Sequence, residues 1–239
     1  MPKLYKKNPI SLPDPFTMEN WVFVFSNNTA IRSIINSFSI MLLSVAISLI
    51  IGIIASYGIY RYKFKGKKSF LIGILIIRVL PPVVTIVPFF VLFKSINLTD
   101  TIWALILIYP AFLIPLVIWL IHGFFCDIPR SIEESARIDG CNWYQSLFKV
   151  MIPLSAPGLI AVAIIVAIAA WNEYILASIL ATKKAVTIPV VVSMQVTERA
   201  IYWGRGCALI IVLIVPIFIL SVFIQKYMAR GLTAGAIKE

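Results

Sequence analysis

Apolar residues in this chain are gathered into five long blocks separated by shorter, more polar segments. The blocks cover residues 34–60, 70–93, 102–125, 159–180 and 208–227. Each block is at least 20 residues long, and a helix needs about 20 residues to cross the hydrocarbon layer of a membrane. A backbone in lipid must satisfy its own polar groups, and the blocks lack the period-two alternation of barrel strands. The pattern therefore predicts an all-α membrane protein with about five transmembrane helices.

Composition agrees with this prediction and narrows the classes of partner. Hydrophobic residues make up 61% of the chain and charged residues 13%, and the mean hydropathy is +0.98, well above that of ordinary globular domains. The net charge is +11, but the basic residues lie in short segments between the apolar blocks and form no basic-aromatic face. This arrangement argues against nucleic-acid binding and indicates a charge bias that orients a membrane protein.

Residues 61–68 carry the strongest orientation signal, since this short segment holds five basic residues and no acidic one. Cytoplasmic loops of membrane proteins are enriched in lysine and arginine, so we expect the segment to face the cytoplasm. Alternation then places 126–158 and the tail after 227 in the cytoplasm, and 94–101 and 181–206 outside.

The same alternation places the N-terminal residues outside, although they contain neither a signal sequence nor a spanning helix that could deliver them there. We therefore expect a further helix upstream in the natural protein, or an internal start at Met1. The predicted organisation is an extracytoplasmic segment 1–33, a transmembrane region 34–227 that includes the cytoplasmic segment 127–158, and a cytoplasmic tail 228–239.

Two of the apolar blocks carry internal features that bear on helix shape and packing. The first has small residues at every fourth position, which form a face where helices approach closely in lipid, within the chain or against a partner. These residues are Ser44, Ser48, Gly52 and Ser56. The second contains three prolines, so we predict that its helix is bent or broken. The prolines are Pro81, Pro82 and Pro88.

Ionisable residues inside the apolar blocks are candidates for a functional site. A charge at the centre of a bilayer costs about 2.5 to 3.5 kcal/mol on insertion scales, so such residues are retained for a reason. Arg78 and Glu173 qualify. They either have a direct role in binding a substrate or are structural residues paired with each other or with a partner subunit. Asn172, between Trp171 and Glu173, adds an amide suited to hydroxyl-rich ligands or to hydrogen bonds between helices.

Residues 127–158 form the one polar segment with a specific pattern, which predicts two short helices separated by a glycine turn. Ser131 and Glu134 have the spacing of a capping box, and Glu133 and Arg137 that of a favourable i, i+4 pair. Gly140, after Asp139, tolerates the positive φ that ends many helices.

Asn142 can cap the second helix of this hairpin, which ends at Pro153 and Pro157. Its apolar side consists of Leu147, Phe148 and Met151. An apolar patch exposed on the inner membrane face predicts a protein partner.

This hairpin resembles the EAA loop of ABC importer permeases. The similarity lies in Glu134-Ser135-Ala136, then Asp139-Gly140, then Ile152-Pro153-Leu154. The chain departs from the family at Ser135, where the family has alanine. Further segments are similar to the maltose-type carbohydrate subfamily of these permeases. They are 12–21, Asn36-Ser37, Trp171-Asn172-Glu173, Trp203-Gly204 and 230–238.

The resemblance implies a type I ABC importer permease fold with six spans, placed as a multi-pass protein in the cell membrane. It also implies four partners: a second homologous permease, two ATPase subunits that hold ATP and Mg²⁺, and an extracytoplasmic sugar-binding protein. In such permeases the loop forms a coupling helix that docks on the ATPase. The implied coupling residues are Glu133, Glu134, Ser135, Ala136, Asp139 and Gly140, and the implied contacts of the binding protein are Ser193, Gln195 and Thr197.

The sequence gives no sign that the chain itself hydrolyses ATP. Gly66-Lys67 lacks the glycine five residues earlier that a phosphate-binding loop requires, so energy is expected from partner subunits and no cofactor is expected in this chain. A membrane-embedded hydrolase is the alternative from another class. The sole histidine, His122, has no G-x-S-x-G companion. A pure scaffold leaves the EAA-like loop unexplained.

The three cysteines form no C-x-x-C pair and give no sign of a metal site or a disulfide framework. We expect Cys126, Cys141 and Cys207 to be buried small apolar residues.

Overall fold

The computed structural model describes residues 17–79, 81–196 and 202–235, and the regular elements within these ranges are helices. The all-α prediction is therefore confirmed. The elements are α1 (Glu19–Ser26), α2 (Asn28–Arg61), α3 (Lys67–Val79), α4 (Pro82–Ser95), α5 (Ile102–Cys126), α6 (Arg130–Ile138), α7 (Trp143–Ser146), the π-helical turn Leu147–Met151, α8 (Ile152–Leu154), α9 (Ala156–Trp171), α10 (Ile175–Leu180), α11 (Ile188–Ser193) and α12 (Trp203–Gly235).

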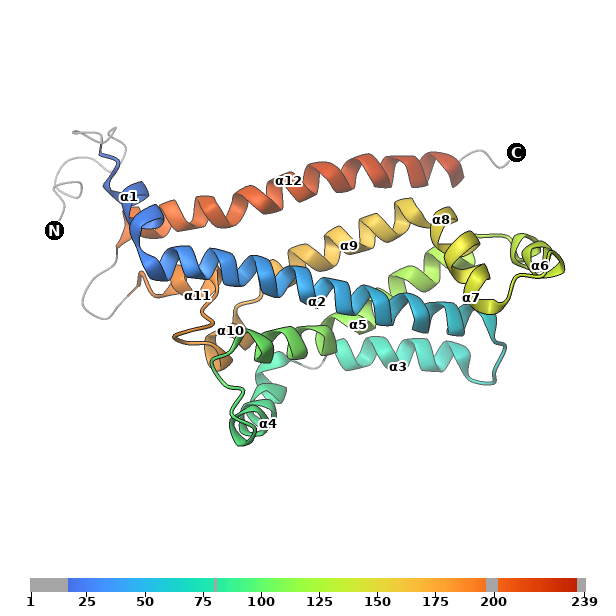
Figure 1. Cartoon of the computed structure of the whole chain (residues 1–239), viewed down its shortest axis with the longest axis horizontal. Coiled ribbons are helices and arrows are strands. Elements are labelled where there is room, and N and C mark those ends of the chain that lie inside the picture. The colour runs from blue at the N-terminus through green and yellow to red at the C-terminus, as the bar shows by residue number, and fades with distance from the viewer. Residues whose placement is uncertain (1–16, 80, 197–201, 236–239) are drawn as a thin grey trace.

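Three helices of the described chain, α2, α5 and α12, are each long and apolar enough to cross a membrane alone. Two bent pairs raise the number of spans to as many as 5, in agreement with the number predicted. They are α3 with α4, at an angle of 81°, and Trp143–Leu154 with α9, at 80°. Figure 1 shows the long helices running side by side, with α6 and α7 at one end of the bundle and α10 and α11 toward the other.

Proline breaks the second span, as predicted. Helix α3 ends at Val79, Pro81 precedes α4 with an extended backbone, and Pro82 occupies the first position of α4. Proline at that position costs nothing because the first N–H groups of a helix have no partner within the helix.

The prediction of one helix over 159–180 is wrong. Helix α9 starts at Ala156 and ends at Trp171, and α10 begins only at Ile175. The Asn172 amide donates to the Ile168 carbonyl over 2.9 Å, and the Glu173 carboxylate accepts the Leu176 N–H over 2.9 Å. The Ile168 carbonyl already accepts the Asn172 N–H over 3.1 Å, so only Glu173 supplies a partner for a backbone donor at the break.

The core of the bundle is the contact between α2 and α5, and the predicted small-residue face lies in it. Ser44 and Ser48 are completely buried. At Gly52 an added Cβ would overlap the Val117 side chain, and the Ser56 hydroxyl donates to the Ile118 carbonyl over 3.0 Å. The predicted packing role is confirmed, and the partner is a helix of the same chain.

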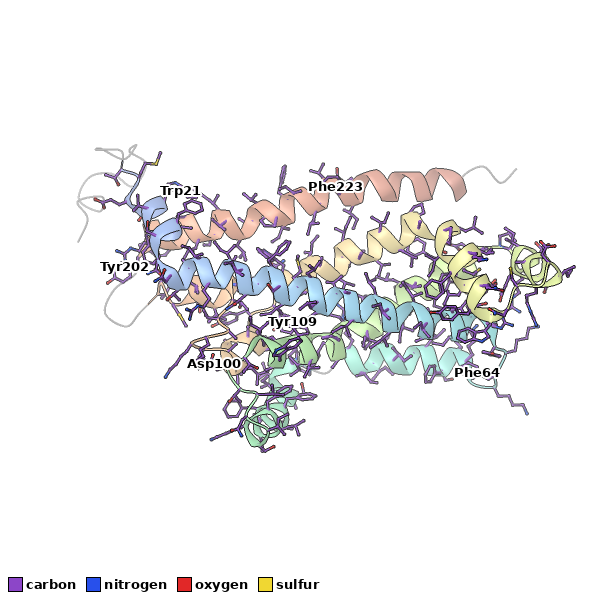
Figure 2. All side chains as sticks on the ribbon, in the orientation of Figure 1. Trp21, Phe64, Asp100, Tyr109, Tyr202 and Phe223 are labelled. Atoms are coloured by element: carbon purple, nitrogen blue, oxygen red, sulfur yellow. The ribbon has the colours of Figure 1, made fainter. Side chains whose placement is uncertain are left out.

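Helix α12 lies at one edge of the bundle (Figure 1) and leaves most of its apolar surface open, with only 11% of its most apolar window buried. Phe223, labelled in Figure 2, is among its exposed large side chains. This face is suited to contact lipid or another membrane-spanning chain.

Replacing Gly52 by alanine should destabilise the bundle, because its new methyl group would overlap Val117 and force α2 away from α5. We expect a loss of about 1–3 kcal/mol, the usual cost of overpacking, measured as a lower midpoint of thermal unfolding in detergent. Gly58→Ala is the matched control in the same helix, since a Cβ there meets nothing within 4 Å. Equal midpoints for the two variants would contradict the close contact.

Candidate functional site

The hairpin of α6 and α7 lies at the end of the bundle where α2 terminates (Figure 1). Helix α6 follows Pro129, which makes no side-chain capping hydrogen bond. The predicted capping box of Ser131 with Glu134 is wrong because the helix already begins at Arg130 and Ser131 lies inside its first turn. Glu134, Ser135 and Asp139 are exposed.

Glu133 points toward the bundle, and the predicted pair with Arg137 is wrong. The Glu133 carboxylate accepts hydrogen bonds from the Tyr57 hydroxyl over 2.7 Å and from the Arg61 guanidinium over 2.9 Å. Arg61 also donates to the Tyr57 oxygen over 2.9 Å. Arg61–Glu133 is the only ion pair within the described residues. Because both partners lie in or beside the last turn of α2, they fix α6 against that helix.

The turn of the hairpin forms as the sequence predicted. Gly140 has φ +87°, its N–H donates to the Arg137 carbonyl over 3.1 Å, and the Cys141 N–H donates to the Ala136 carbonyl over 3.0 Å. This pair of bonds is the Schellman ending of a helix, which requires a left-handed residue at Gly140. Nothing lies within 4 Å of a Cβ built there, so the requirement comes from the backbone alone.

Asn142 caps α7, also as predicted. Its side chain accepts the Gln145 N–H over 2.8 Å, and the Gln145 side chain accepts the Asn142 N–H over 3.0 Å. The two bonds form a capping box.

The exposed apolar surface of the hairpin differs from the predicted one. Leu147 and Met151 are completely buried, because the π-helical turn that contains them faces the bundle. Phe148, the third residue of the predicted apolar side, is exposed as predicted. Three other large side chains are also exposed, and the four form what we call the hairpin patch: Ile138, Trp143, Tyr144 and Phe148. The ring centroids of Tyr144 and Phe148 lie 4.6 Å apart, so the patch has a contiguous aromatic part.

A charged pocket of about 100 Å³ opens beside α6 at the end of α2. It is lined by Tyr60, Arg61, Arg130, Glu133, Glu134 and Arg137. The Arg130 guanidinium lies over the Tyr60 ring, 5.7 Å from its centroid. The contribution of α2 to this site was missed by the sequence analysis, although an arginine directly after an apolar span was a usable signal.

The second group of candidate residues lies at the break between α9 and α10. Glu173 lines a cavity of about 30 Å³ together with Tyr109, whose buried hydroxyl has no hydrogen-bond partner among the described residues. A cavity of that size admits a water molecule. Tyr109 lies near the middle of the bundle (Figure 2). Arg78 is exposed on α3 and makes no ion pair with Glu173, so the predicted pairing of these two residues with each other is excluded. The alternative of pairing with a partner subunit stays a prediction.

The residues predicted to contact a binding protein lie toward the end of the helix bundle opposite to the hairpin (Figure 1). The Ser193 hydroxyl donates to the Val190 carbonyl over 2.7 Å, and the Gln195 amide to the Val191 carbonyl over 3.1 Å. Both bonds are local, and both side chains are half-buried. Thr197 lies outside the described residues.

Residues 182–188, which lead into α11, are held by side chains from two other parts of the chain. Asp100 accepts the N–H groups of Lys183 over 2.9 Å and Lys184 over 3.0 Å. The Asn36 amide of α2 donates to the carbonyls of Lys184 over 3.1 Å and Val186 over 3.0 Å. Asn36 and Ser37 thus lie inside α2 and act on a distant segment. Asp100, labelled at this end in Figure 2, was missed by sequence analysis.

The environment of Asp100 favours its charged form. Burial by itself would raise the pKa of this carboxyl, but hydrogen bonds from backbone N–H groups of residues 182–185 outweigh it and lower the pKa below its usual value. A carboxyl whose pKa is lowered by folding stabilises the folded state above its unfolded pKa, and this contribution is lost as the pH falls through the folded pKa.

The cysteines differ from expectation, because Cys126 and Cys207 are exposed and Cys141 is only half-buried. Within the described residues no group of three or more histidine, cysteine, aspartate or glutamate side chains is placed to hold a metal ion.

The chain is similar to known proteins over most of its length. Residues 48–234 match the family model described as "Binding-protein-dependent transport system inner membrane component". The trehalose transport system permease protein SugB of Mycobacterium tuberculosis is 36% identical over 95% of this chain and 84% of its own length. The trehalose/maltose transport system permease protein MalG of Thermococcus litoralis is 32% identical over 98% and 87% of the two chains.

Among solved structures, a chain of a bacterial ABC transporter involved in import of the acidic polysaccharide alginate is similar, with a TM-score of 0.72 and 26% identity. The match covers 90% of this chain and 81% of that one.

Replacing Asp100 by asparagine should loosen residues 183–185, because the amide carries no charge and offers one acceptor atom where the carboxylate offers two. We expect faster hydrogen exchange of the Lys183, Lys184 and Ala185 amides at neutral pH. The difference from the wild type should shrink as the pH falls through the lowered pKa of Asp100. Asp127→Asn, at an exposed position, is the control. Unchanged exchange at neutral pH would show that these bonds contribute nothing.

Proposed function

The chain belongs to the family of binding-protein-dependent transport system inner membrane components, and from this premise we propose that it is a permease subunit of an ATP-driven importer of carbohydrates. The relatives that match nearly its whole length include permeases of trehalose, maltose and arabinooligosaccharide systems. The substrate class of this chain is therefore a sugar or oligosaccharide. Selection among sugars belongs chiefly to the binding protein.

The observation that carries the proposal is the hairpin at one end of the bundle. It has a capped second helix, a glycine turn and the hairpin patch, and no other described part of the chain covers that patch. A rigid turn with an exposed aromatic surface is suited to insert into a groove of another protein. We assign this role to the ATPase subunit. Glu134, Ser135, Ala136 and Asp139 then lie on or beside the docking surface, whereas Glu133 anchors it from behind.

The charge distribution supports one orientation of the bundle. The basic segment 61–68, marked by Phe64 in Figure 2, lies at the same end as the hairpin. This end is cytoplasmic by the positive-inside rule, and the opposite end with Asp100 and α11 is extracytoplasmic. The C-terminal tail 228–239 is then cytoplasmic, and 1–33 is extracytoplasmic.

The assembly that we propose is that of the resembled family. The sequence shows no phosphate-binding loop, which supports hydrolysis by two partner ATPase subunits with their ATP and Mg²⁺. The open apolar face of α12 is available to a second permease or to lipid. Closure of the ATPase pair would move the hairpins and rock the two permeases, which opens the pathway to each side in turn.

The break between α9 and α10 is the part of this chain best suited to line the pathway. Asn172 is exposed and Glu173 half-buried there, in a helix interrupted within the bundle. Interrupted helices carry the binding sites of many transporters because they offer polar groups at membrane depth. Arg78 is exposed on α3 and does not line the cavity at Glu173, and we assign it no substrate contact.

The isolated chain should neither bind nor hydrolyse ATP. We expect no nucleotide turnover above the detergent blank for the purified subunit, and turnover only after the ATPase subunits are added. The measurement is phosphate release at saturating ATP and Mg²⁺. Turnover by the chain alone would refute the proposal that partner subunits hydrolyse the ATP.

Gly140→Leu should uncouple transport from ATP hydrolysis. A branched residue at φ +87° is strained by about 1 to 2 kcal/mol, which tilts α6 relative to α7 without unfolding the bundle. Sugar uptake by vesicles should fall sharply while the amount of assembled complex changes little. Gly140→Asn should retain most uptake, because asparagine tolerates positive φ.

Two further variants distinguish an effect specific to the hairpin from a general effect of backbone strain. Gly66 has φ +85° in the turn before α3, with nothing within 4 Å of an added Cβ, so Gly66→Leu imposes the same strain elsewhere. Ser135→Ala, which restores the family residue, should be nearly silent. Full uptake by Gly140→Leu would mean that the hairpin is not the coupling element.

A further inference from the structure

Helix α2 makes side-chain hydrogen bonds to a distant segment near each of its ends. Toward its start, Asn36 and Ser37 hold residues 184–188, with the Ile188 N–H donating to the Ser37 hydroxyl over 2.9 Å. At its end, Tyr57 and Arg61 hold Glu133 of the hairpin. Ser37 and Tyr57 are separated by about 30 Å at the helical rise of 1.5 Å per residue.

The body of α2 between these two attachments is built to be stiff. It is one uninterrupted helix over Asn28–Arg61, whereas α3 with α4 and Trp143–Leu154 with α9 form bent pairs. Its buried small residues bring it against α5, where the Ser56 hydroxyl reaches the Ile118 carbonyl. A close-packed helix without proline moves as a rigid body because its packed face resists bending.

The attachment at the start of α2 reaches the base of the outer loop. Residues 184–188 lead directly into α11, and α11 leads to Gln195, whose carbonyl accepts the Tyr202 N–H over 3.0 Å. A partner that binds around Ser193 and Gln195 therefore presses on a segment tied to Asn36 and Ser37.

The attachment at the end of α2 controls the position of α6. Within the described chain, the bonds to Tyr57 and Arg61 are the only side-chain hydrogen bonds between α6 and the membrane-spanning helices. The Arg61 and Glu133 side chains are only 16% and 10% exposed. Loss of one charge would leave the other buried without its partner, so α6 would no longer stay against α2.

We propose that α2 transmits movement between the two ends of the bundle, so that a binding protein at the outer end stimulates ATP hydrolysis at the hairpin end. Asn36 and Arg61 are the positioning residues of this helix. This inference rests on the proposed function and adds the route by which the two ends communicate. Coupling between distant sites needs an element that both sites act on, and α2 is hydrogen-bonded to residues 184–188 before the outer site and to Glu133 of the hairpin.

The test uses the assembled complex of this chain with the second permease, two ATPase subunits and the sugar-loaded binding protein in lipid nanodiscs. The readout is the ratio of ATP hydrolysis with and without binding protein. Arg61→Met and Asn36→Leu should each lower this ratio by about fivefold or more, the lower range of coupling between distant sites. Arg32→Met, at an exposed arginine of the same helix, is the matched control and should keep the wild-type ratio.

Charge reversal separates positioning from a structural defect. Glu133→Arg alone places two like charges together and should abolish stimulation, whereas Glu133→Arg with Arg61→Glu should recover it. A double variant that assembles but is stimulated no better than Glu133→Arg would overturn the role of the ion pair. Wild-type stimulation in Asn36→Leu would overturn the role of the outer attachment.

The outcomes also distinguish the inference from its premise. If Arg61→Met fails to assemble, Asn36→Leu and the double variant still decide the matter. If the wild-type complex shows no stimulation by any sugar-loaded binding protein, the proposed function fails, whatever the variants do.

Discussion

The close approach of α2 and α5 is the contact on which the remaining structure depends. In lipid there is little hydrophobic force between helices, so packing and hydrogen bonds must hold them. The absence of a side chain at Gly52 and the small serines around it let the backbones meet, and Ser56 adds a hydrogen bond across the interface. α9 and α3 then pack against this pair, and both ends of α2 are placed where they can hold other segments.

Polar side chains in the bundle act mainly at places where the helical hydrogen-bond pattern is interrupted or a loop must be fixed. Glu173 accepts the Leu176 N–H at the break after α9, and Asp100 accepts N–H groups of the segment before α11. An unsatisfied backbone group at membrane depth costs several kcal/mol, so the Glu173 bond favours irregular backbone at that break. The same irregular places are the ones suited to bind a substrate or a partner.

The hairpin combines two surfaces with different tasks. Glu133 is turned inward to α2, and the hairpin patch is turned outward and left uncovered. A docking element needs an outer surface that binds the partner and an inner contact with the bundle. The partner can move the transmembrane helices only if the element that it binds is fixed to them. The family membership and the sugar-system relatives are those of a transport permease subunit.

The sequence by itself determined the all-α class, the number of spans, the break at Pro81 and Pro82, the glycine turn and the cap at Asn142. Each depends on local properties: length of an apolar run, the missing N–H of proline, and the φ range open to glycine. Only the tertiary structure decided that Glu133 pairs with Arg61 and not Arg137, that Leu147 and Met151 face inward, and that Asn36 and Asp100 hold residues 183–186. These contacts join residues far apart in the chain, and a sequence pattern records which residues could pair but not which of them the packing of helices brings within bonding distance.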